Sequence, residues 1–413
     1  MRGTFFKGLD YYILRYIIVF CFFPSVLFSQ KQEISFLFIG DIMGHGPQIR
    51  AAWQDSIKQY DYNEVFSPVK DLIMSVDFAV ANLEVTLAGP PYDGYPQFSS
   101  PDELAVACKE NGIDALVTAN NHSCDRGKKG VIRTVRTLDS LGISHTGTFE
   151  NDKYRDSLNL LIVSKNNIKI GILNYTYGTN GLPFAKPSYV NLLDSALILK
   201  DLSMAQEANL DKLIVVAHWG TEYQDFPNKY QKNYNHFFLE NGVDVVIGSH
   251  PHVLQPMIYK RDTLTNKEKL TVYSLGNFVS NQRERRKDGG AMFKLSFKRV
   301  KDQVLIEDKE YILTWVYKYK SGNKNHYQIL PCAQNIYNQT YFPVSDHFTK
   351  MNVFLTDSRA HLENNEHVNE GSAYPEVEIT IKPPVSLHPA KERKIKRTKK
   401  EKTRKRIFRK KRR

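Results

Sequence analysis

Between residues 33 and 290, short apolar runs alternate with longer stretches of mixed polarity. Seven runs are rich in β-branched residues and end in a polar or glycine-containing segment, which is typical of buried strands in a sheet with parallel pairing. They are ISFLFIGD, FAVANLE, DALVTANNH, IKIGILNYT, KLIVVAHWG, VDVVIGSHPH and LTVYSLGNF. Helical patterns lie between them, over residues 101–111, 128–141 and 230–241. In ENGID and ENGVD a glycine marks the end of a helix. The pattern predicts an α/β fold.

Beyond Gly290 the pattern changes. Residues 291–300, 303–320 and 325–331 alternate apolar and polar positions, as antiparallel strands with one wetter face do. We expect these strands to close the same domain, which would extend over residues 31–330. Residues 331–385 are weakly patterned and are expected to form a C-terminal extension.

The net charge of +13 comes from one end of the chain. Residues 391–413 hold sixteen Lys or Arg and two Glu, so the rest of the chain carries about −1. A general basic face is therefore not expected on the body. Residues 386–413 are predicted to form a disordered basic tail. It could bind an anionic polymer or an acidic membrane, at about 1 kcal/mol per basic residue near the membrane, or simply be a solvated tail.

The amino-terminal residues 1–30 are typical of an export signal. Three basic residues among the first fifteen precede a thirteen-residue apolar stretch over residues 16–28, and Ser29 offers a small residue near a cleavage point. An uncleaved membrane anchor is the alternative, because residues 11–14 could extend the apolar run. We therefore expect a periplasmic, envelope-associated or outward-facing anchored protein. Export favours envelope polyanions over nucleic acid as partners of the tail.

The cysteines predict no disulfide framework and no metal site of close pairs. The four are widely spaced, and a single Cys108–Cys124 bridge remains open as an alternative in an oxidising compartment.

Side chains that can bind metals follow almost every predicted strand. Each alone has an ordinary explanation, such as a hydrogen-bonded histidine, a turn aspartate or a capping asparagine. We expect them to gather at one edge of one sheet, because ligands collect at the carboxyl ends of parallel strands. These residues are Asp41, His45, Glu84, Asn121, His122, Asp125, His218, Glu222, His250, His252 and Asn277.

The mixture of carboxylate, imidazole and amide groups predicts which metals suit the site. It fits Mn, Fe or Zn better than Ca, which prefers oxygen alone, or Cu(I), which prefers sulfur. Two such ions about 3.5 to 4 Å apart could share one bridging carboxylate and lower the pKa of a bound water toward roughly 7.

Six blocks in order resemble a known family. GDIMGH, NLE, ANNHSCDRG, HWGTEY, GSHPHVLQP and SLGNF look like the signatures of the CapA-type capsule synthesis proteins, also called poly-γ-glutamate biosynthesis proteins. Those proteins belong to the calcineurin-like metallophosphatase superfamily. The resemblance covers roughly residues 33–316 and implies a four-layer sandwich of two mixed β-sheets flanked by helices, with a cleft for two metal ions at the strand ends.

The resemblance also implies roles for the carboxylates. Asp41 corresponds to the aspartate of the first metal, and His252 to another ligand of that metal. Glu84 corresponds to the bridging carboxylate, where most phosphatases of the superfamily have Asp. The usual Asp-x-His opening is replaced here by Asp41-Ile-Met-Gly-His45, so the resemblance leaves open whether His45 binds a metal.

The resemblance also implies roles for the Asn-His motif and for two further histidines. Asn121 corresponds to the amide ligand, His122 to the catalytic histidine, and His218 and His250 to ligands of the second ion. If the backbone at 121–122 is extended, the two neighbouring side chains point in opposite directions. His122 would then lie above the metals as a general acid, held by Asp125 from the first turn of the next helix.

Three interpretations of function follow. The first is an exported CapA-like protein, a metal-dependent hydrolase-like enzyme acting in synthesis, processing or release of poly-γ-glutamate or a related anionic polymer. The second is an exported metallophosphoesterase that uses the same cleft. The third is a scaffold that handles polymer without catalysis. Phosphatase activity does not follow from the fold alone.

Overall fold

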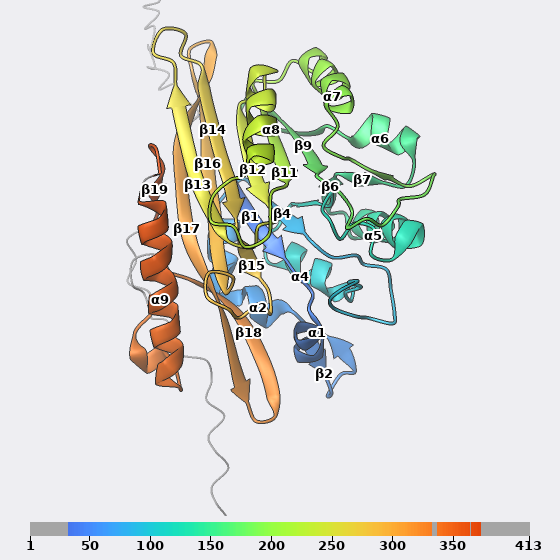
Figure 1. The fold of residues 1–413 in the computed structure, drawn as a ribbon, viewed down its shortest axis with the longest axis vertical. Helices are drawn as coiled ribbons and strands as arrows, with labels where there is room; N and C mark the ends of the chain where they lie inside the picture. Colours follow the sequence, from blue (N-terminus) through green and yellow to red (C-terminus); the bar gives the residue numbers. More distant parts are fainter. Residues whose placement is uncertain (1–31, 333–336, 364, 373–413) are drawn as a thin grey trace, which may run out of the picture.

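The computed structural model describes residues 32–332, 337–363 and 365–372. The predicted export signal and the predicted basic tail therefore lie outside the described residues, as does Cys21. The described chain is an α/β protein in which two mixed β-sheets pack face to face, with helices on their outer faces (Figure 1). This is the four-layer arrangement that the family resemblance implied.

The first sheet runs in the order β18-β17-β16-β1-β4-β5-β6. Strands β1, β4, β5 and β6 are parallel, whereas β16, β17 and β18 are antiparallel, as the alternation after Gly290 predicted. Strand β15 extends the sheet by pairing with the end of β1, and β19 pairs with β17. The strands are β1 (Glu33–Ile42), β4 (Phe78–Leu83), β5 (Ala115–Val117), β6 (Ser144–Thr146), β15 (Asn277–Val279), β16 (Gly289–Val300), β17 (Gln303–Ser321), β18 (Lys324–Pro331) and β19 (Asn369–Glu370).

The second sheet runs in the order β13-β14-β12-β11-β9-β8. Its centre is parallel and both edge strands are antiparallel. Two small two-stranded sheets, β2 with β3 and β7 with β10, lie apart from the main sheets. The strands are β8 (Leu161–Lys165), β9 (Ile168–Thr176), β11 (Lys212–His218), β12 (Val245–Ser249), β13 (Leu254–Arg261), β14 (Glu268–Leu275), β2 (Trp53–Gln54), β3 (Gln59–Tyr60), β7 (Thr148–Phe149) and β10 (Tyr189–Val190).

Helices cover the outer faces of both sheets. Helices α4, α5 and α8 appear where the sequence predicted them, and Gly112 and Gly242 end two of them at φ of +95° and +96°, a conformation that glycine adopts without strain. The helices are α1 (Gly46–Ala52), α2 (Asn63–Phe66), α3 (Lys70–Met74), α4 (Glu103–Glu110), α5 (Gly127–Leu141), α6 (Asp152–Leu158), α7 (Ser195–Glu207), α8 (Lys229–Glu240) and α9 (Ser345–Leu362).

Strand β1 shows how the layers are held together. Its Phe36 and Phe38 side chains point between the two sheets, where Ile172 of β9 also packs. Its Leu37 and Ile39 point the other way, toward the helices on the outer face. Because side chains alternate along a strand, one buried strand can contribute to two cores. A third cluster lies between the second sheet and helices α7 and α8.

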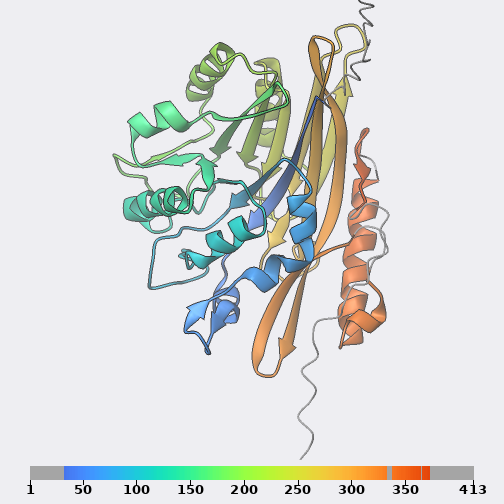
Figure 2. The same cartoon turned by 180° about the vertical axis from the view of Figure 1, so that it is seen from behind.

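Helix α9 was not predicted, because residues 331–385 carry only a weak apolar pattern. Its buried Met351, Phe354 and Leu355 join the core between the sheets. The helix lies alongside the long strands β13 and β17, on the side away from α4 and α5 (Figures 1 and 2).

Two further findings bear on the sequence expectations. No helix within residues 32–332, 337–363 and 365–372 has both the length and the hydropathy that crossing a membrane requires. Cys108, Cys124 and Cys332 are free buried thiols, so the alternative Cys108–Cys124 bridge is not formed.

Candidate metal centre

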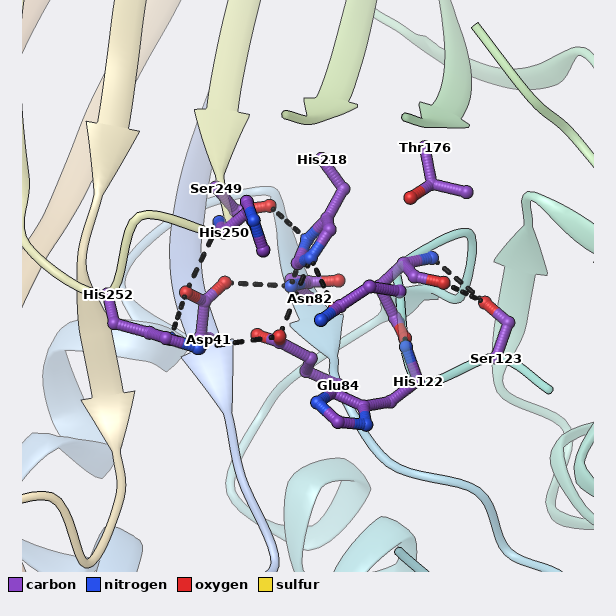
Figure 3. A network of polar contacts seen from close by, with 12 residues as sticks. Asp41, Asn82, Glu84, His122, Ser123, Thr176, His218, Ser249, His250 and His252 are labelled. Carbon is purple, nitrogen blue, oxygen red and sulfur yellow. Dashed lines mark hydrogen bonds and ion pairs between the residues drawn. The ribbon is translucent and has the colours of Figure 1, made fainter. Parts of the chain in front are cut away.

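Five buried side chains come together at the carboxyl ends of four parallel strands. They form two groups whose ligand atoms lie within 4.8 Å of one another, and both groups share one carboxylate (Figure 3). The first group is Glu84, His218 and His250, and the second is Asp41, Glu84 and His252.

These side chains come from both sheets, so the expectation of one edge of one sheet was wrong. Asp41 and Glu84 lie at the ends of β1 and β4 of the first sheet, whereas His218, His250 and His252 lie at the ends of β11 and β12 of the second. The reason is geometric: the two sheets face each other, and their parallel strands end at the same side of the sandwich.

Asp41 connects the two sheets. Its Oδ2 lies 3.1 Å from Nδ1 of His252 and accepts a long hydrogen bond of 3.4 Å from the backbone N–H of His250. Its Oδ1 accepts a 2.8 Å hydrogen bond from Nδ2 of Asn82. The backbone N–H of Asp41 in turn donates to the carbonyl of Gly276, so β1 and β15 hold this carboxylate in place.

Asn82 and Ser249 are site residues that the sequence interpretation missed. Nδ2 of Asn82 lies 3.3 Å from Nδ1 of His218, and Oγ of Ser249 lies 3.1 Å from the same nitrogen. Both therefore orient the imidazole from behind, as second-layer partners of metal-binding histidines commonly do. The available signal was a polar residue inside the apolar run FAVANLE, two positions before Glu84.

The other ring nitrogen of His218 faces the shared carboxylate and the predicted amide ligand. Nε2 lies 2.8 Å from Oδ1 of Asn121 and 3.4 Å from Oε1 of Glu84. The structure therefore places Asn121 beside the first group, where an amide oxygen could serve as a further donor to a metal.

His250 and His252 have backbone conformations that are unfavourable for residues with a Cβ. Their φ angles are +98° and +59°, in the left-handed region. Such conformations cost of order 1 kcal/mol or more and are concentrated at functional sites. The bend around Pro251 turns both imidazoles toward the carboxylates, which explains why the apolar strand β12 ends so abruptly in SHPH.

Glu84 shows most clearly that the site suits a cation. Both its carboxylate oxygens are buried and have no hydrogen-bond donor within the described chain, and Nδ1 of His250 also has no partner there. Buried polar atoms are normally paired, since an unpaired one is costly. Carboxylate oxygens and imidazole nitrogens facing one another are the donor set of a divalent transition ion, so the residues present fit a pair of such ions.

Burial controls the protonation of these groups. Burial and the neighbouring charge of Asp41 raise the pKa of Glu84 well above its ordinary value. Burial would also raise the pKa of Asp41, but the hydrogen bond and charge of His252 outweigh it and lower that pKa. Burial lowers the pKa of His218 to about 3 and that of His250 well below its ordinary value. Both histidines are therefore neutral at physiological pH, the form that binds metals.

His122 and Asp125 are in direct contact beside the two groups. Nδ1 of His122 lies 2.8 Å from Oδ2 of Asp125, which also accepts a 2.7 Å hydrogen bond from the backbone N–H of Phe98. Residues 121–126 form turns rather than extended chain, and Asp125 precedes α5 instead of lying in its first turn. Those two details of the prediction were wrong, because Ser123 bonds back to Thr118 and Asn120 and bends the chain directly after β5.

His45 belongs to neither group. It precedes α1, and its Nδ1 lies 3.1 Å from Oε1 of Gln48 and 3.3 Å from the backbone nitrogen of Asn281. Burial lowers its pKa to about 4. Asn277 also serves the surrounding chain, since its Nδ2 donates to the carbonyl of Lys287 at 2.8 Å.

An open cleft of about 610 Å³ lies over the centre. His122, His252, His45 and Glu222 are among the residues that line it. The remaining lining residues are Met43, Tyr95, Phe98, Tyr223, Asn281, Gln282, Arg283, Glu284 and Lys287.

Fold and site together define the class: an α/β sandwich with two ligand groups that share one buried carboxylate at its strand ends. Residues 35–282 match the family described as bacterial capsule synthesis protein PGA_cap. This match covers more than half of the chain, and the protein therefore belongs to that family, as the six sequence blocks predicted.

Two relatives carry related names. The chain is 28% identical over 265 residues to the capsule biosynthesis protein CapA of Bacillus anthracis, a match that covers 61% of each chain. It is 24% identical over 346 residues to the PGA biosynthesis protein CapA of Bacillus subtilis strain 168, covering 81% of this chain and 80% of that protein. The match thus spans about three fifths of the Bacillus anthracis protein.

Solved structures with a similar arrangement include phosphoesterases. The calcineurin-like phosphoesterase YfkN of Bacillus subtilis is 13% identical with a TM-score of 0.40, covering 80% of this chain and 98% of that chain. A putative 5'-nucleotidase of Staphylococcus aureus is also 13% identical, with a TM-score of 0.42, covering 78% of this chain and 58% of that chain. The family assignment rests on the sequence match.

Proposed function

We propose that the protein acts in the synthesis, processing or release of poly-γ-glutamate or a related anionic envelope polymer, through a centre of two divalent ions. One observation carries the proposal: the buried carboxylate of Glu84 is shared by two ligand groups and has no hydrogen-bond donor among the described residues. The names of the two CapA relatives support the choice of polymer.

The proposed ligand sets follow the two groups. Asp41, Glu84 and His252 would hold one ion, and Glu84, His218 and His250 the other, with Asn121 as an additional oxygen donor. Mn, Fe or Zn suits these donors. When bound, such ions supply a water of lowered pKa and polarise the bond under attack.

The chain's own residues would manage the protons. A carboxylate can only accept a hydrogen bond, so in this proposal Nδ1 of His122 carries the proton that lies between the ring and Asp125. In the imidazolium form, protonated at both nitrogens, His122 would give the proton on Nε2 to the departing group in the cleft that it lines and keep the one on Nδ1. In this proposal His122 is the catalytic acid and Asp125 is a positioning residue, a division of roles like that of other orienting carboxylates.

Substrate and metal assays test this proposal against the two alternatives. The full chain, stripped with a chelator and reloaded with Mn, Fe or Zn, should shorten or transfer poly-γ-glutamate only when metal is restored. His250→Ala is the matched control and should remain inactive after reloading. Turnover of phosphate esters without any action on polymer would support the metallophosphoesterase instead. A metal-loaded protein that binds polymer but turns over neither substrate would support the scaffold.

We also propose that the protein is exported and held at the envelope by residues 386–413. The apolar residues 16–28 and the sixteen Lys or Arg among residues 391–413 support this proposal. The expected partner is an anionic polymer or an acidic membrane surface rather than nucleic acid, since an exported protein works outside the cytoplasm.

A further inference from the structure

The loop between β15 and β16 forms one wall of the cleft above the proposed metal centre. Nδ2 of Asn277 donates to the carbonyl of Lys287 at 2.8 Å, which fixes the end of the loop. Oδ1 of Asn281 accepts a 2.8 Å hydrogen bond from Nζ of Lys318 in β17. These contacts position the loop before any ligand binds, so a side chain that it presents to the cleft is preorganised.

The sequence of this loop, SNQRERRKD over residues 280–288, is rich in cations. Three of its four basic side chains form ion pairs with carboxylates. The pairs are Arg285 with Asp357 of α9, Arg286 with Asp225, and Lys287 with Glu284.

Arg283 is the fourth cation, and it has no such partner in residues 32–332, 337–363 and 365–372. Its Nη1 is buried without any hydrogen-bond acceptor there. Its guanidinium carbon lies 5.9 Å from the centre of the Trp315 ring. Burial lowers the pKa of Arg283, while the charge of Asp288 acts against this shift without forming an ion pair. A half-buried cation with a buried N–H donor that lacks an acceptor is unfavourable.

The surroundings of Arg283 carry a further positive charge. Burial and the charge of Arg283 both lower the pKa of Lys318. Arg283 lines the open cleft, and Lys318 lies close to it and binds Asn281 of the same loop, so the two cations create a local potential that attracts an anion. Arg283 lines the same cleft as His122 and His252, so an anion bound there would lie within reach of the proposed centre.

We infer that Arg283 binds a carboxylate of the substrate beside the bond that is acted on, and so determines specificity for an anionic polymer. The planar guanidinium matches a carboxylate with two parallel hydrogen bonds, which a lysine cannot reproduce. Each amide bond of poly-γ-glutamate is flanked by a free α-carboxylate, so the required anion recurs along that chain. This inference rests on the proposed function for the identity of the polymer.

Binding of a labelled oligo-γ-glutamate to the metal-loaded full chain tests the inference. We expect Arg283→Gln to weaken binding ten- to hundredfold, as loss of a charged hydrogen-bonded pair does. Arg283→Lys should recover only part of the affinity. Arg285→Gln is the matched control from the same loop, with a side chain that is 55% exposed, and should change affinity less than twofold. An oligomer with methyl-esterified carboxylates should bind equally weakly to wild type and to all three variants.

Two further readouts separate ligand binding from a structural role. Metal content should be the same in all variants, and the Tm of Arg283→Gln should not fall, because the substitution removes a buried unpaired charge. A fall in Tm with unchanged affinity would overturn the inference, as would equal binding by wild type and Arg283→Gln. Binding without turnover by wild type would overturn the proposed catalysis and leave the Arg283 assignment standing. Failure of wild type to bind the oligomer would overturn both.

Discussion

Single polar atoms decide how the candidate centre is arranged. Asn82 contacts both Asp41 and His218, and Ser249 contacts the same nitrogen of His218, Nδ1. Such orienting contacts select which nitrogen of a histidine faces the metal. In this protein they leave Nε2 of His218 facing Glu84 and Asn121, which is the arrangement that a shared carboxylate needs.

His122 is the residue whose variant best separates catalysis from metal binding. His122→Ala should keep its metal and lower turnover by about 10² to 10⁴, because a positioned acid contributes that factor. His250→Ala should lose metal as well. Metal analysis of both purified variants, followed by the polymer assay, checks the prediction. If His122→Ala loses metal as readily as His250→Ala, His122 is a ligand and not the acid.

The buried thiol of Cys108 should make the free energy of unfolding depend on pH, independently of the metal centre. Burial raises the pKa of this thiol from 9.0 to about 12. Between these values the folded state keeps a proton that the unfolded state loses, so this contribution to stability falls as pH rises, by about 1 kcal/mol from pH 8 to pH 10. Denaturant unfolding at both pH values should show a smaller loss for Cys108→Ala than for wild type. An identical loss would contradict the prediction.

At the level of elements, strand ends rather than helices carry the site. Strand β1 lies between β4 and β15 at this end of the sheet, and Asp41 is paired with Asn82 of β4 on one side and with Asn277 of β15 on the other. The close approach of these strands requires Gly40, because a Cβ there would lie 2.3 Å from the carbonyl oxygen of Gly276. The backbone contact therefore controls where the carboxylate of Asp41 lies.

Gly40→Ala should accordingly weaken metal binding without touching any ligand. The added methyl would push β1 from β15, shift Asp41, and cost about 1 to 3 kcal/mol of stability as overpacking does. Gly178→Ala is the matched control, since no atom lies within 4 Å of a Cβ at that position. Metal titration and denaturant unfolding of both variants provide the measurement. Equal metal affinity in the two variants would contradict the prediction, because it would show that the added methyl group does not displace Asp41.

At the scale of the whole molecule, the centre joins two sheets that also pack against each other through a large apolar core. The ligands of each group come from both sheets, so a metal that binds only the folded chain should stabilise the sandwich as a unit. With free metal at 100 times its Kd, this stabilisation is about 2.7 kcal/mol.

Metal removal should therefore lower the Tm of the wild-type protein. Thermal unfolding before and after chelation, and again after adding Mn or Zn, measures the effect. His250→Ala should show a smaller response to chelator than wild type, because one of the two ligand groups is incomplete. A wild-type Tm that chelation and metal leave unchanged would contradict the metal-centre hypothesis.

The basic residues 391–413 should determine attachment to envelope material or anionic polymer, and they should not affect turnover. Removing residues 386–413, or replacing their Lys and Arg by Gln at constant length, should reduce sedimentation with envelope material or anionic polymer. Wild-type attachment should weaken as salt rises past about 0.15 M, where the Debye length is near 8 Å. Turnover of short oligomers should be preserved in both variants. Unchanged attachment after removal would refute this role.

Local sequence determined much of the fold and the chemical inventory of the site. The apolar runs, the glycines at 112 and 242, and the ligand-type residues after each strand depend on neighbours a few positions apart, which a single sequence displays directly. The family resemblance then assigned Glu84 as the shared carboxylate, and the structure places it in both groups.

Only the tertiary structure decided which of these residues meet. Asp41 and His252 are 211 positions apart and belong to different sheets, and their contact depends on how the sheets pack. The same long-range packing leaves His45 outside both groups, brings Asn82 behind the ligands, and leaves Arg283 unpaired at the cleft, within the described residues. Local patterns determine what each strand end offers, whereas convergence in space is a property of the whole packed chain.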